Sequence, residues 1–168
     1  MEILCSATAV QARTRELGQE ISEFYQGQTL TLVALLNGAM FFAADLARAI
    51  NLELRIDSIA VSSYDGQKSS GRIAVRGDCK LPVRAKNLLL VDGVLDTGLT
   101  LDTVTKILLA RGAQSVRTCV LAEKNRPRSA NIRPPDWCGF QLPNRFLVGC
   151  GMDAGEQYRQ WPYIAALD

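Results

Sequence analysis

The sequence contains no histidine among its 168 residues. This absence excludes serine and cysteine triads with an imidazole base, zinc sites with histidine ligands, and histidine acids or bases. The five cysteines are odd in number and form no Cys-x-x-Cys pair, which supports neither a disulfide framework nor a zinc ribbon. Any chemistry must therefore use carboxylates, lysine, arginine, tyrosine, hydroxyl groups, backbone dipoles or a bound metal.

The sequence also lacks a continuous apolar run of the kind that crosses a membrane. Residues 24–44 form an uncharged stretch of 21 residues, but glutamines, threonines and the pair Asn37-Gly38 divide it. We therefore expect a buried strand, a turn and a helix there. The N-terminus has neither a basic segment nor an apolar segment of a secretory signal, so we expect a cytoplasmic protein without a membrane partner.

The remaining composition is that of one soluble globular domain, with 48% hydrophobic and 21% charged residues. The net charge of +2 is the sum of −3 in residues 1–60, +7 in residues 61–135 and −2 in residues 136–168. The basic middle segment is either a solvated face or the surroundings of a small polyanion. The weak overall charge argues against nucleic acid as a partner.

Wholly apolar stretches alternate with stretches in which apolar residues recur every three or four positions. The first pattern is typical of strands that are covered on both faces, and the second of amphipathic helices. The alternation predicts an α/β fold with a mostly parallel, twisted central sheet flanked by helices, while the proline-rich remainder after residue 122 is expected to be irregular. The predicted helices are 7–24, capped by Ser6, 40–50 and 100–111, and the predicted strands are 30–36, 54–63, 73–76, 88–91 and 116–122.

Ligands of open α/β sheets bind beyond the carboxyl ends of the strands, so we looked for chemistry in the turns that follow them. The strongest candidate is the segment 88–101, in which an apolar strand leads to Asp92, then to Asp96, and then through Thr-Gly-x-Thr into a helix. Free backbone N–H groups, hydroxyls and a glycine suit a phosphate. The alternative is a helix cap on an ordinary strand-to-helix turn. Neither a Walker sequence nor Gly-x-Gly-x-x-Gly is present.

This segment resembles the phosphoribosyl-pyrophosphate motif of type I phosphoribosyltransferases. The resemblance to bacterial hypoxanthine and hypoxanthine-guanine phosphoribosyltransferases extends from Ile3 to Leu167. The other matching strings are 36–46, 61–64, 124–129, 135–140, 145–153 and Tyr158-Arg159. It implies a type I phosphoribosyltransferase fold in a single domain, with a core of about residues 7–125 and a small hood of about residues 1–6 and 126–168.

The resemblance implies transfer of the phosphoribosyl group from phosphoribosyl pyrophosphate to hypoxanthine or guanine, which gives IMP or GMP and pyrophosphate with the help of Mg²⁺. A transition state of oxocarbenium character needs charge neutralised on the leaving group, so a site without histidine suffices. The resemblance implies that Asp96 is the acid–base group at the purine N7, and that Asp96, Thr97, Gly98, Leu99 and Thr100 bind the 5′-phosphate. It implies that Asp92 binds the ribose, and that the purine is bound by Lys124, Phe146 and Leu147. The implied pyrophosphate ligands are Asn37, Gly38 and Arg159, and the implied metal ligands are Asp153 and Asp92.

Three further expectations follow from the resemblance. Relatives often have a non-proline cis peptide in the pyrophosphate loop at residues 36–38, where the sequence alone indicates a simple turn. Residues 63–72, beginning with Ser63 and Tyr64, resemble a lid that closes over the site, although a surface loop explains them equally well. Relatives of this kind also assemble as homodimers or homotetramers, and residues 40–42 are expected in the core or in such an interface.

The chain departs from its relatives at three positions. Most have Glu-Asp where this chain has Asp92-Gly93, and many have lysine in place of Leu99 or Asn37. If each lost contact is worth about 1 to 2 kcal/mol, donor affinity falls by about tenfold per site. Two alternatives therefore stay open: a regulatory paralogue that binds a sugar phosphate or nucleotide with little or no turnover, and a transferase for another base such as xanthine.

Among the remaining residues, Arg126 and Arg128 are interpreted as a solvated loop, with Arg128 the better candidate for a role near the site.

Overall fold

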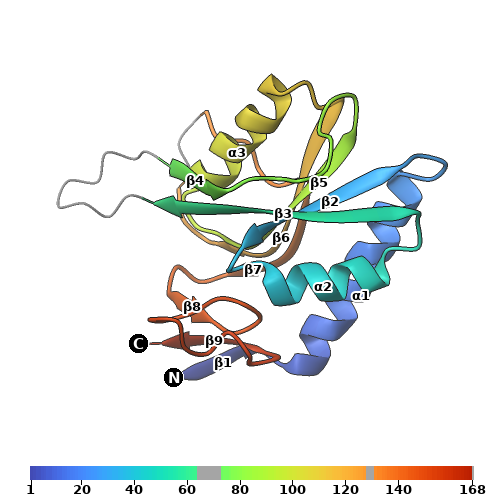
Figure 1. Cartoon of the computed structure of the whole chain (residues 1–168). Coiled ribbons are helices and arrows are strands. Elements are labelled where there is room, and N and C mark those ends of the chain that lie inside the picture. Colours follow the sequence, from blue (N-terminus) through green and yellow to red (C-terminus); the bar gives the residue numbers. More distant parts are fainter. Residues whose placement is uncertain (64–72, 128–130, 168) are drawn as a thin grey trace.

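The computed structural model of the protein describes residues 1–63, 73–127 and 131–167. Figure 1 shows a central sheet with helices on both of its faces, and a second, smaller sheet beside one end of it. The central sheet has six strands in the order β4-β3-β2-β5-β6-β7, and the smaller sheet has three in the order β1-β9-β8. The predicted α/β fold class is confirmed.

The four pairings among β3, β2, β5, β6 and β7 are parallel, and β4 is an antiparallel strand at the edge. Every residue from Leu30 to Leu35 is buried, because helices cover both faces of the sheet at this strand. The bounds are β2 (Leu30–Leu36), β3 (Leu54–Ser63), β4 (Ile73–Gly77), β5 (Asn87–Leu95), β6 (Ser115–Lys124) and β7 (Trp137–Leu142).

The three helices lie where the periodicity predicts them. They are α1 (Ala7–Phe24), α2 (Met40–Ala49) and α3 (Leu99–Ala110). The Ser6 hydroxyl accepts a hydrogen bond from the Ala9 N–H at 3.2 Å, which confirms the predicted cap. Helices α1 and α2 lie against one face of the sheet and α3 against the other (Figure 1). A methyl group on Gly18 would lie 2.5 Å from the Ala49 side chain, so this glycine permits the close packing of α1 on α2.

The smaller sheet, called the hood below, joins the two ends of the chain. It consists of β1 (Glu2–Cys5), β8 (Phe146–Val148) and β9 (Ile164–Leu167), and all of its pairings are antiparallel. The hood predicted from the sequence includes all of 126–168 as an irregular stretch. Instead, residues 137–142 form β7 and pair with β6 in the central sheet. The two prolines before β7 and the glycine within it obscure the strand pattern in the sequence.

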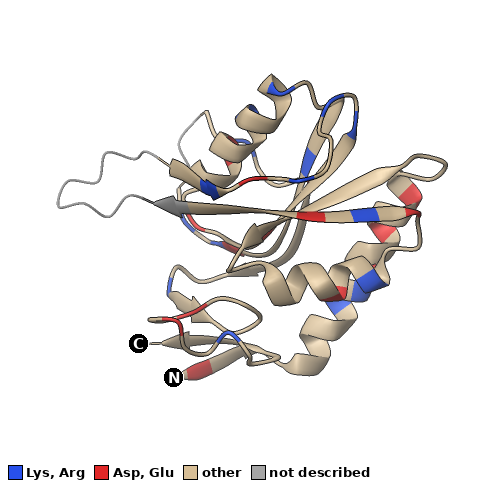
Figure 2. Cartoon of the chain, viewed as in Figure 1, with Lys and Arg blue, Asp and Glu red and all other residues tan. Residues whose placement is uncertain are grey.

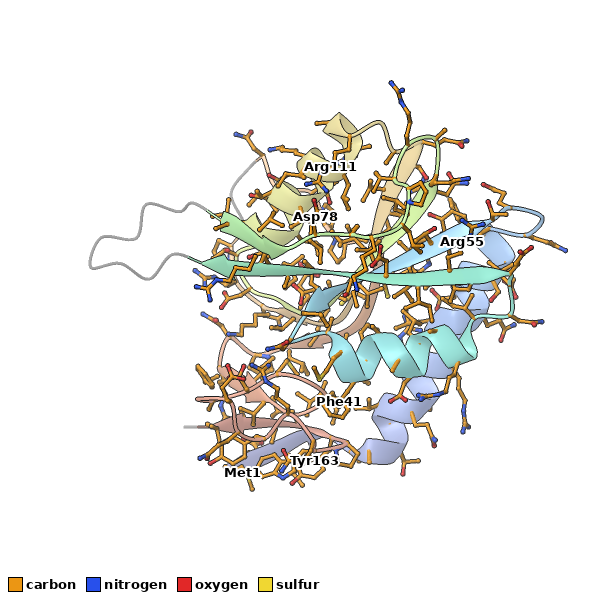
Figure 3. The ribbon with its side chains drawn as sticks, viewed as in Figure 1. Met1, Phe41, Arg55, Asp78, Arg111 and Tyr163 are labelled. Carbon is orange, nitrogen blue, oxygen red and sulfur yellow. The ribbon has the colours of Figure 1, made fainter. Side chains whose placement is uncertain are left out.

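Charges of both signs are interspersed along the ribbon in Figure 2, as the small net charge suggests. Among the described residues, no helix is both long and apolar enough to cross a bilayer. Phe41 projects from α2 (Figure 3) and is 42% exposed, and it lines a cavity of about 500 Å³ with Trp161 of the chain segment before β9.

Candidate active site

The carboxyl ends of the parallel strands bring several polar turns to one edge of the central sheet. Residues 37–39 follow β2, residues 96–98 follow β5, and residues 125–127 follow β6. Because β2, β5 and β6 are neighbours in the sheet, the turns that follow them are neighbours too. The candidate site is built on these three turns and on the loop between β8 and β9.

The phosphate turn differs slightly from the prediction. Strand β5 continues to Leu95, four residues beyond its expected end, so Asp92 lies within the strand and pairs in register with Val120. Asp96 is the first residue after the strand. Helix α3 begins at Leu99, one residue early, after Gly98 in the left-handed conformation with φ of 80°.

No side chain caps the first turn of α3, and the Thr97 hydroxyl instead accepts a weak hydrogen bond from the Leu99 N–H at 3.3 Å. The unpaired N–H groups of a helix start and the positive end of its dipole favour an anion. The turn from Asp96 to Thr100 therefore has the chemistry expected of a phosphate site.

Asp96 is held by two cations, one on each of its carboxylate oxygens. Lys124, the last residue of β6, donates to Oδ2 at 3.0 Å, and Arg126 donates to Oδ1. Burial raises the pKa of Asp96, but the hydrogen bonds and charges of Lys124 and Arg126 outweigh it, and the net pKa lies below the ordinary value. Asp96 is thus an ionised carboxylate at neutral pH.

Asp92 has the opposite electrostatic environment. Its side chain is half-buried, and its Oδ1 accepts a hydrogen bond from the Gly93 N–H at 2.7 Å. Burial raises the pKa of Asp92 to about 6, and the backbone hydrogen bonds of Gly93 and Val94 offset only part of this effect. Among the described residues no cation contributes to the pKa of Asp92, and a carboxylate in such surroundings suits sugar hydroxyls or a metal ion.

The loop after β2 has the cis peptide expected from the resemblance, between Leu36 and Asn37. The carbonyl oxygen of the next residue, Gly38, lies between two other glycines. A Cβ atom on Gly93 would be 2.7 Å from this oxygen, and one on Gly151 would be 2.2 Å from it. Neither contact is possible, so the loop after β2, strand β5 and the loop between β8 and β9 meet here only because Gly93 and Gly151 lack a side chain.

Arg159 and Asp153 belong to the loop between β8 and β9. The Arg159 Nη2 lies 2.9 Å from the Asp153 Oδ1, and its Nη1 donates to the Gly151 carbonyl oxygen at 2.6 Å. Asp153 Oδ2 also accepts from the Glu156 N–H at 2.8 Å. These contacts fix the loop that presses on Gly38, and so connect Arg159 with the pyrophosphate loop.

The predicted purine-binding residues come from both sheets. Lys124 belongs to the central sheet, and its side chain is only 13% exposed. Phe146 and Leu147 lie on β8 of the hood, where the Phe146 ring is 53% exposed and Leu147 is buried and pairs with Ala166. An aromatic ring so exposed is available for stacking. In the expected lid, Ser63 ends β3, whereas Tyr64 and the residues up to 72 lie outside the described residues.

The two predicted metal ligands are carboxylates, a ligand type and number that suit Mg²⁺. Asp92 and Asp153 lie on two segments that meet at Gly38, through Gly93 and Gly151. Within the described part of the chain, no group of three or more histidine, cysteine, aspartate or glutamate side chains could hold a metal by itself. Magnesium commonly takes one or two carboxylates and completes its shell with water and substrate phosphates, so two carboxylates are a sufficient donor set.

Two features of the site were not predicted. Arg126, interpreted from the sequence as a solvated loop residue, binds the candidate catalytic carboxylate. The contact of Gly38 with Gly93 and Gly151 was also missed, although each of these glycines lies in a string that matches the family.

Comparison with known proteins shows the family to which the chain belongs. A family model described as the phosphoribosyl transferase domain matches residues 4–154. The chain is 39% identical to a hypoxanthine-guanine phosphoribosyltransferase of Mycobacterium avium over 99% of this chain and 85% of the relative. It is 35% identical to a hypoxanthine-guanine-xanthine phosphoribosyltransferase of Tritrichomonas foetus, over 98% and 90%. A crystal structure of a hypoxanthine phosphoribosyltransferase from Staphylococcus aureus superposes with a TM-score of 0.93 at 34% identity, and the match covers 100% of this chain and 91% of that one.

The fold and the site thus define a phosphoribosyltransferase. The chain belongs to the phosphoribosyltransferase family, in its hypoxanthine and hypoxanthine-guanine phosphoribosyltransferase branch.

Proposed function

We propose that the protein transfers the 5-phosphoribosyl group from phosphoribosyl pyrophosphate to a 6-oxopurine base in purine salvage, giving the nucleotide and pyrophosphate. The observation that carries this proposal is the ion pair of Lys124 with Asp96, the first residue of the phosphate turn. It supplies a cationic donor for an oxo group and a carboxylate for a ring nitrogen, side by side. An amino group, as in adenine, would not accept from an ammonium ion.

In the proposed complex, residues 96–100 hold the 5′-phosphate at the start of α3, and Asp92 binds the ribose hydroxyls. Asn37, Gly38 and Arg159 bind the pyrophosphate group. The Arg159 guanidinium now pairs with Asp153, so it is already oriented before an anion arrives. This order places the reacting carbon between the phosphate turn and the pyrophosphate loop, which follow the neighbouring strands β5 and β2.

At the base, Lys124 donates to the 6-oxo group, Phe146 stacks on the ring and the Leu147 backbone contacts its pyrimidine edge. As a purine nitrogen forms its bond to the sugar carbon, the bond from that carbon to pyrophosphate breaks and its electron pair leaves with the pyrophosphate. The ionised Asp96 accepts the proton from N7. No imidazole is needed, in agreement with a chain that has none.

Asp153 and Asp92 would hold Mg²⁺ together with oxygens of the donor. The ion would neutralise charge on the leaving pyrophosphate. Asp153 is oriented for this role by Arg159 and by the Glu156 N–H.

A pyrophosphate-release assay tests the proposal, with phosphoribosyl pyrophosphate, Mg²⁺ and each of hypoxanthine, guanine, xanthine and adenine. We expect release with at least one 6-oxopurine and none with adenine. Absence of release with every base would refute an enzymatic function, and release with adenine alone would refute the 6-oxopurine assignment. The named relatives act on hypoxanthine, guanine and, in one case, xanthine, so the assay also decides among these bases.

A second candidate function is regulation by binding a sugar phosphate or nucleotide with little turnover. Gly93 favours it, because most relatives have an acid there and the ribose site retains only Asp92. Calorimetric binding of IMP without measurable pyrophosphate release would support this alternative.

We further infer a single-domain cytoplasmic protein that forms a homodimer or homotetramer. All five cysteines are free thiols, as expected in a reducing compartment. The exposed Met40 and Phe41 on α2 offer apolar surface for self-association, and light scattering of the purified protein tests this.

A further inference from the structure

Arg126 occupies a place that the roles described so far do not use. It follows β6 by two residues and reaches back to Asp96, the first residue after β5. Its side chain is 36% exposed, and that of Asp96 is 42% exposed, so both are accessible from the site. The Arg126 Nη1 binds Oδ1 of Asp96, while Lys124 binds Oδ2 of the same carboxylate.

This division of the two oxygens has a consequence when a base binds. The proposed function requires Lys124 to turn its ammonium group toward the 6-oxo group of the purine, and this leaves Oδ2 free to face the ring nitrogen. Oδ1 keeps its partner, because Arg126 has no other assigned ligand in the reaction. The guanidinium stays charged at every working pH, so its single contact through Nη1 anchors Oδ1 while Oδ2 changes partner.

We propose that Arg126 is a positioning residue for Asp96, holding Oδ1 so that Oδ2 is directed at the purine when Lys124 moves to the base. This inference rests on the proposed function. Arg126 does not contact the reacting atoms in this inference. It orients the Asp96 carboxylate, which does contact them, and keeps it ionised.

The charges around Asp96 support this role. Among the described residues, the charged groups that act on its carboxylate are Lys124 at the end of β6 and Arg126 just beyond it. Both lower the pKa of Asp96 against the effect of burial. Without Arg126 the pKa rises, so a smaller share of Asp96 is ionised at acidic pH and the acidic limb of the activity profile moves to higher pH.

The test compares Arg126→Gln with Arg126→Lys and with a matched control. Arg111, at the end of α3, binds the Oδ1 of Asp78 through its own Nη1, and its exposure is 37%. Figure 3 shows this pair beside α3 and β4. Arg111→Gln therefore removes an ion pair of the same geometry and exposure outside the site.

We expect kcat for a 6-oxopurine to fall about tenfold in Arg126→Gln, which corresponds to about 1.4 kcal/mol. The KM for phosphoribosyl pyrophosphate should change less than about twofold, since the donor is held elsewhere. The acidic limb of the kcat profile should move to higher pH, Arg126→Lys should recover part of the turnover, and Arg111→Gln should behave as wild type. Titration of the Asp96 carboxyl carbon by NMR gives the same pKa shift without turnover.

The inference is overturned if Arg126→Gln matches Arg111→Gln in turnover and pH profile. It is equally overturned if only the donor KM rises, because Arg126 would then be a phosphate ligand. Wild-type protein that releases no pyrophosphate with any base refutes the proposed function instead, so the two failures are distinguishable. If Arg126→Gln unfolds at a much lower temperature than Arg111→Gln, then Arg126→Lys and its NMR titration decide.

Discussion

Replacing Gly93 by aspartate restores the acid that most relatives have at this position, yet we expect it to weaken donor binding. A Cβ at Gly93 would lie 2.7 Å from the Gly38 carbonyl oxygen, 3.3 Å from its carbon and 3.4 Å from Met152 Cγ. Ordinary contact begins at 3.4 Å, so the oxygen must retreat by about 0.7 Å, the difference of 3.4 and 2.7. The obstacle is backbone, which cannot rotate out of the way as a side chain can.

The magnitude follows from the cost of overpacking. Forcing an extra carbon into a close-packed site typically costs about 1 to 3 kcal/mol. Gly151 also lies close to the Gly38 oxygen, where its Cβ would be 2.2 Å away, so a shift of this oxygen disturbs the loop that carries Asp153. If this cost falls on the pyrophosphate loop in the complex, the affinity for phosphoribosyl pyrophosphate decreases by about 5- to 150-fold. A restored carboxylate contact of about 1 to 2 kcal/mol would not offset a cost at the upper end of the range of about 1 to 3 kcal/mol.

Three variants separate the side chain's charge from its volume. Gly93→Ala adds only the clashing carbon, Gly93→Asp adds the carboxylate as well, and Gly77→Ala is the control, because a Cβ there meets only the Ala60 side chain at 3.4 Å. Donor affinity is measured by calorimetry with Mg²⁺, and stability by thermal unfolding. Tighter donor binding by Gly93→Asp than by wild type, with an unchanged melting temperature, would show that the space argument is wrong.

The remaining predictions concern the charged residues of the site. Asp96→Asn should lower turnover by about 10²- to 10⁴-fold with little change in donor affinity, and wild-type turnover would disprove the acid–base role. Lys124→Met should lower kcat/KM for the 6-oxopurine at least about tenfold while the donor KM stays constant, and equal effects on both substrates would contradict its assignment to the base. In metal-free protein, Asp92→Asn should raise the free energy of unfolding at pH 8 by up to about 3 kcal/mol and have little effect at pH 4. The sign follows because burial raises the pKa of Asp92 to about 6, so ionising it between pH 4 and 6 destabilises the folded state; pH-independent stability differences in chemical denaturation would contradict this.

The sequence predicted the elements that pack against continuous apolar surface. Strand β2 has the predicted bounds, and α1 begins at its predicted cap, because burial on both faces and a 3.6-residue period leave a clear pattern. Strand β7 was missed because Gly139 and Gln141 interrupt its apolar residues and two prolines precede it. Its pairing with β6 is a property of the tertiary structure that a local pattern does not record.

The candidate site could be located from the sequence but not assembled from it. The acids of the phosphate turn were found because they follow an apolar strand. The contact of the Gly38 carbonyl with Gly93 and Gly151 involves three segments far apart in the chain, and a backbone oxygen leaves no signature in side-chain type. Arg126 was assigned to solvent for a related reason: a loop arginine has many possible partners, and only the fold brings this one to Asp96.

The two cations on Asp96 pose a problem for a catalytic base, because they lower the affinity of its carboxylate for the proton it must accept. The proposed binding of the purine resolves the problem. When the Lys124 ammonium group turns from Asp96 to the purine oxo group, Asp96 loses one of its two cations, and its proton affinity rises as a ring proton faces it. On the proposed function, the same movement that recognises a 6-oxopurine makes Asp96 a stronger base, and an adenine, which does not attract Lys124, leaves the carboxylate paired. In a chain without histidine, substrate binding itself can thus adjust the pKa of the acid–base group.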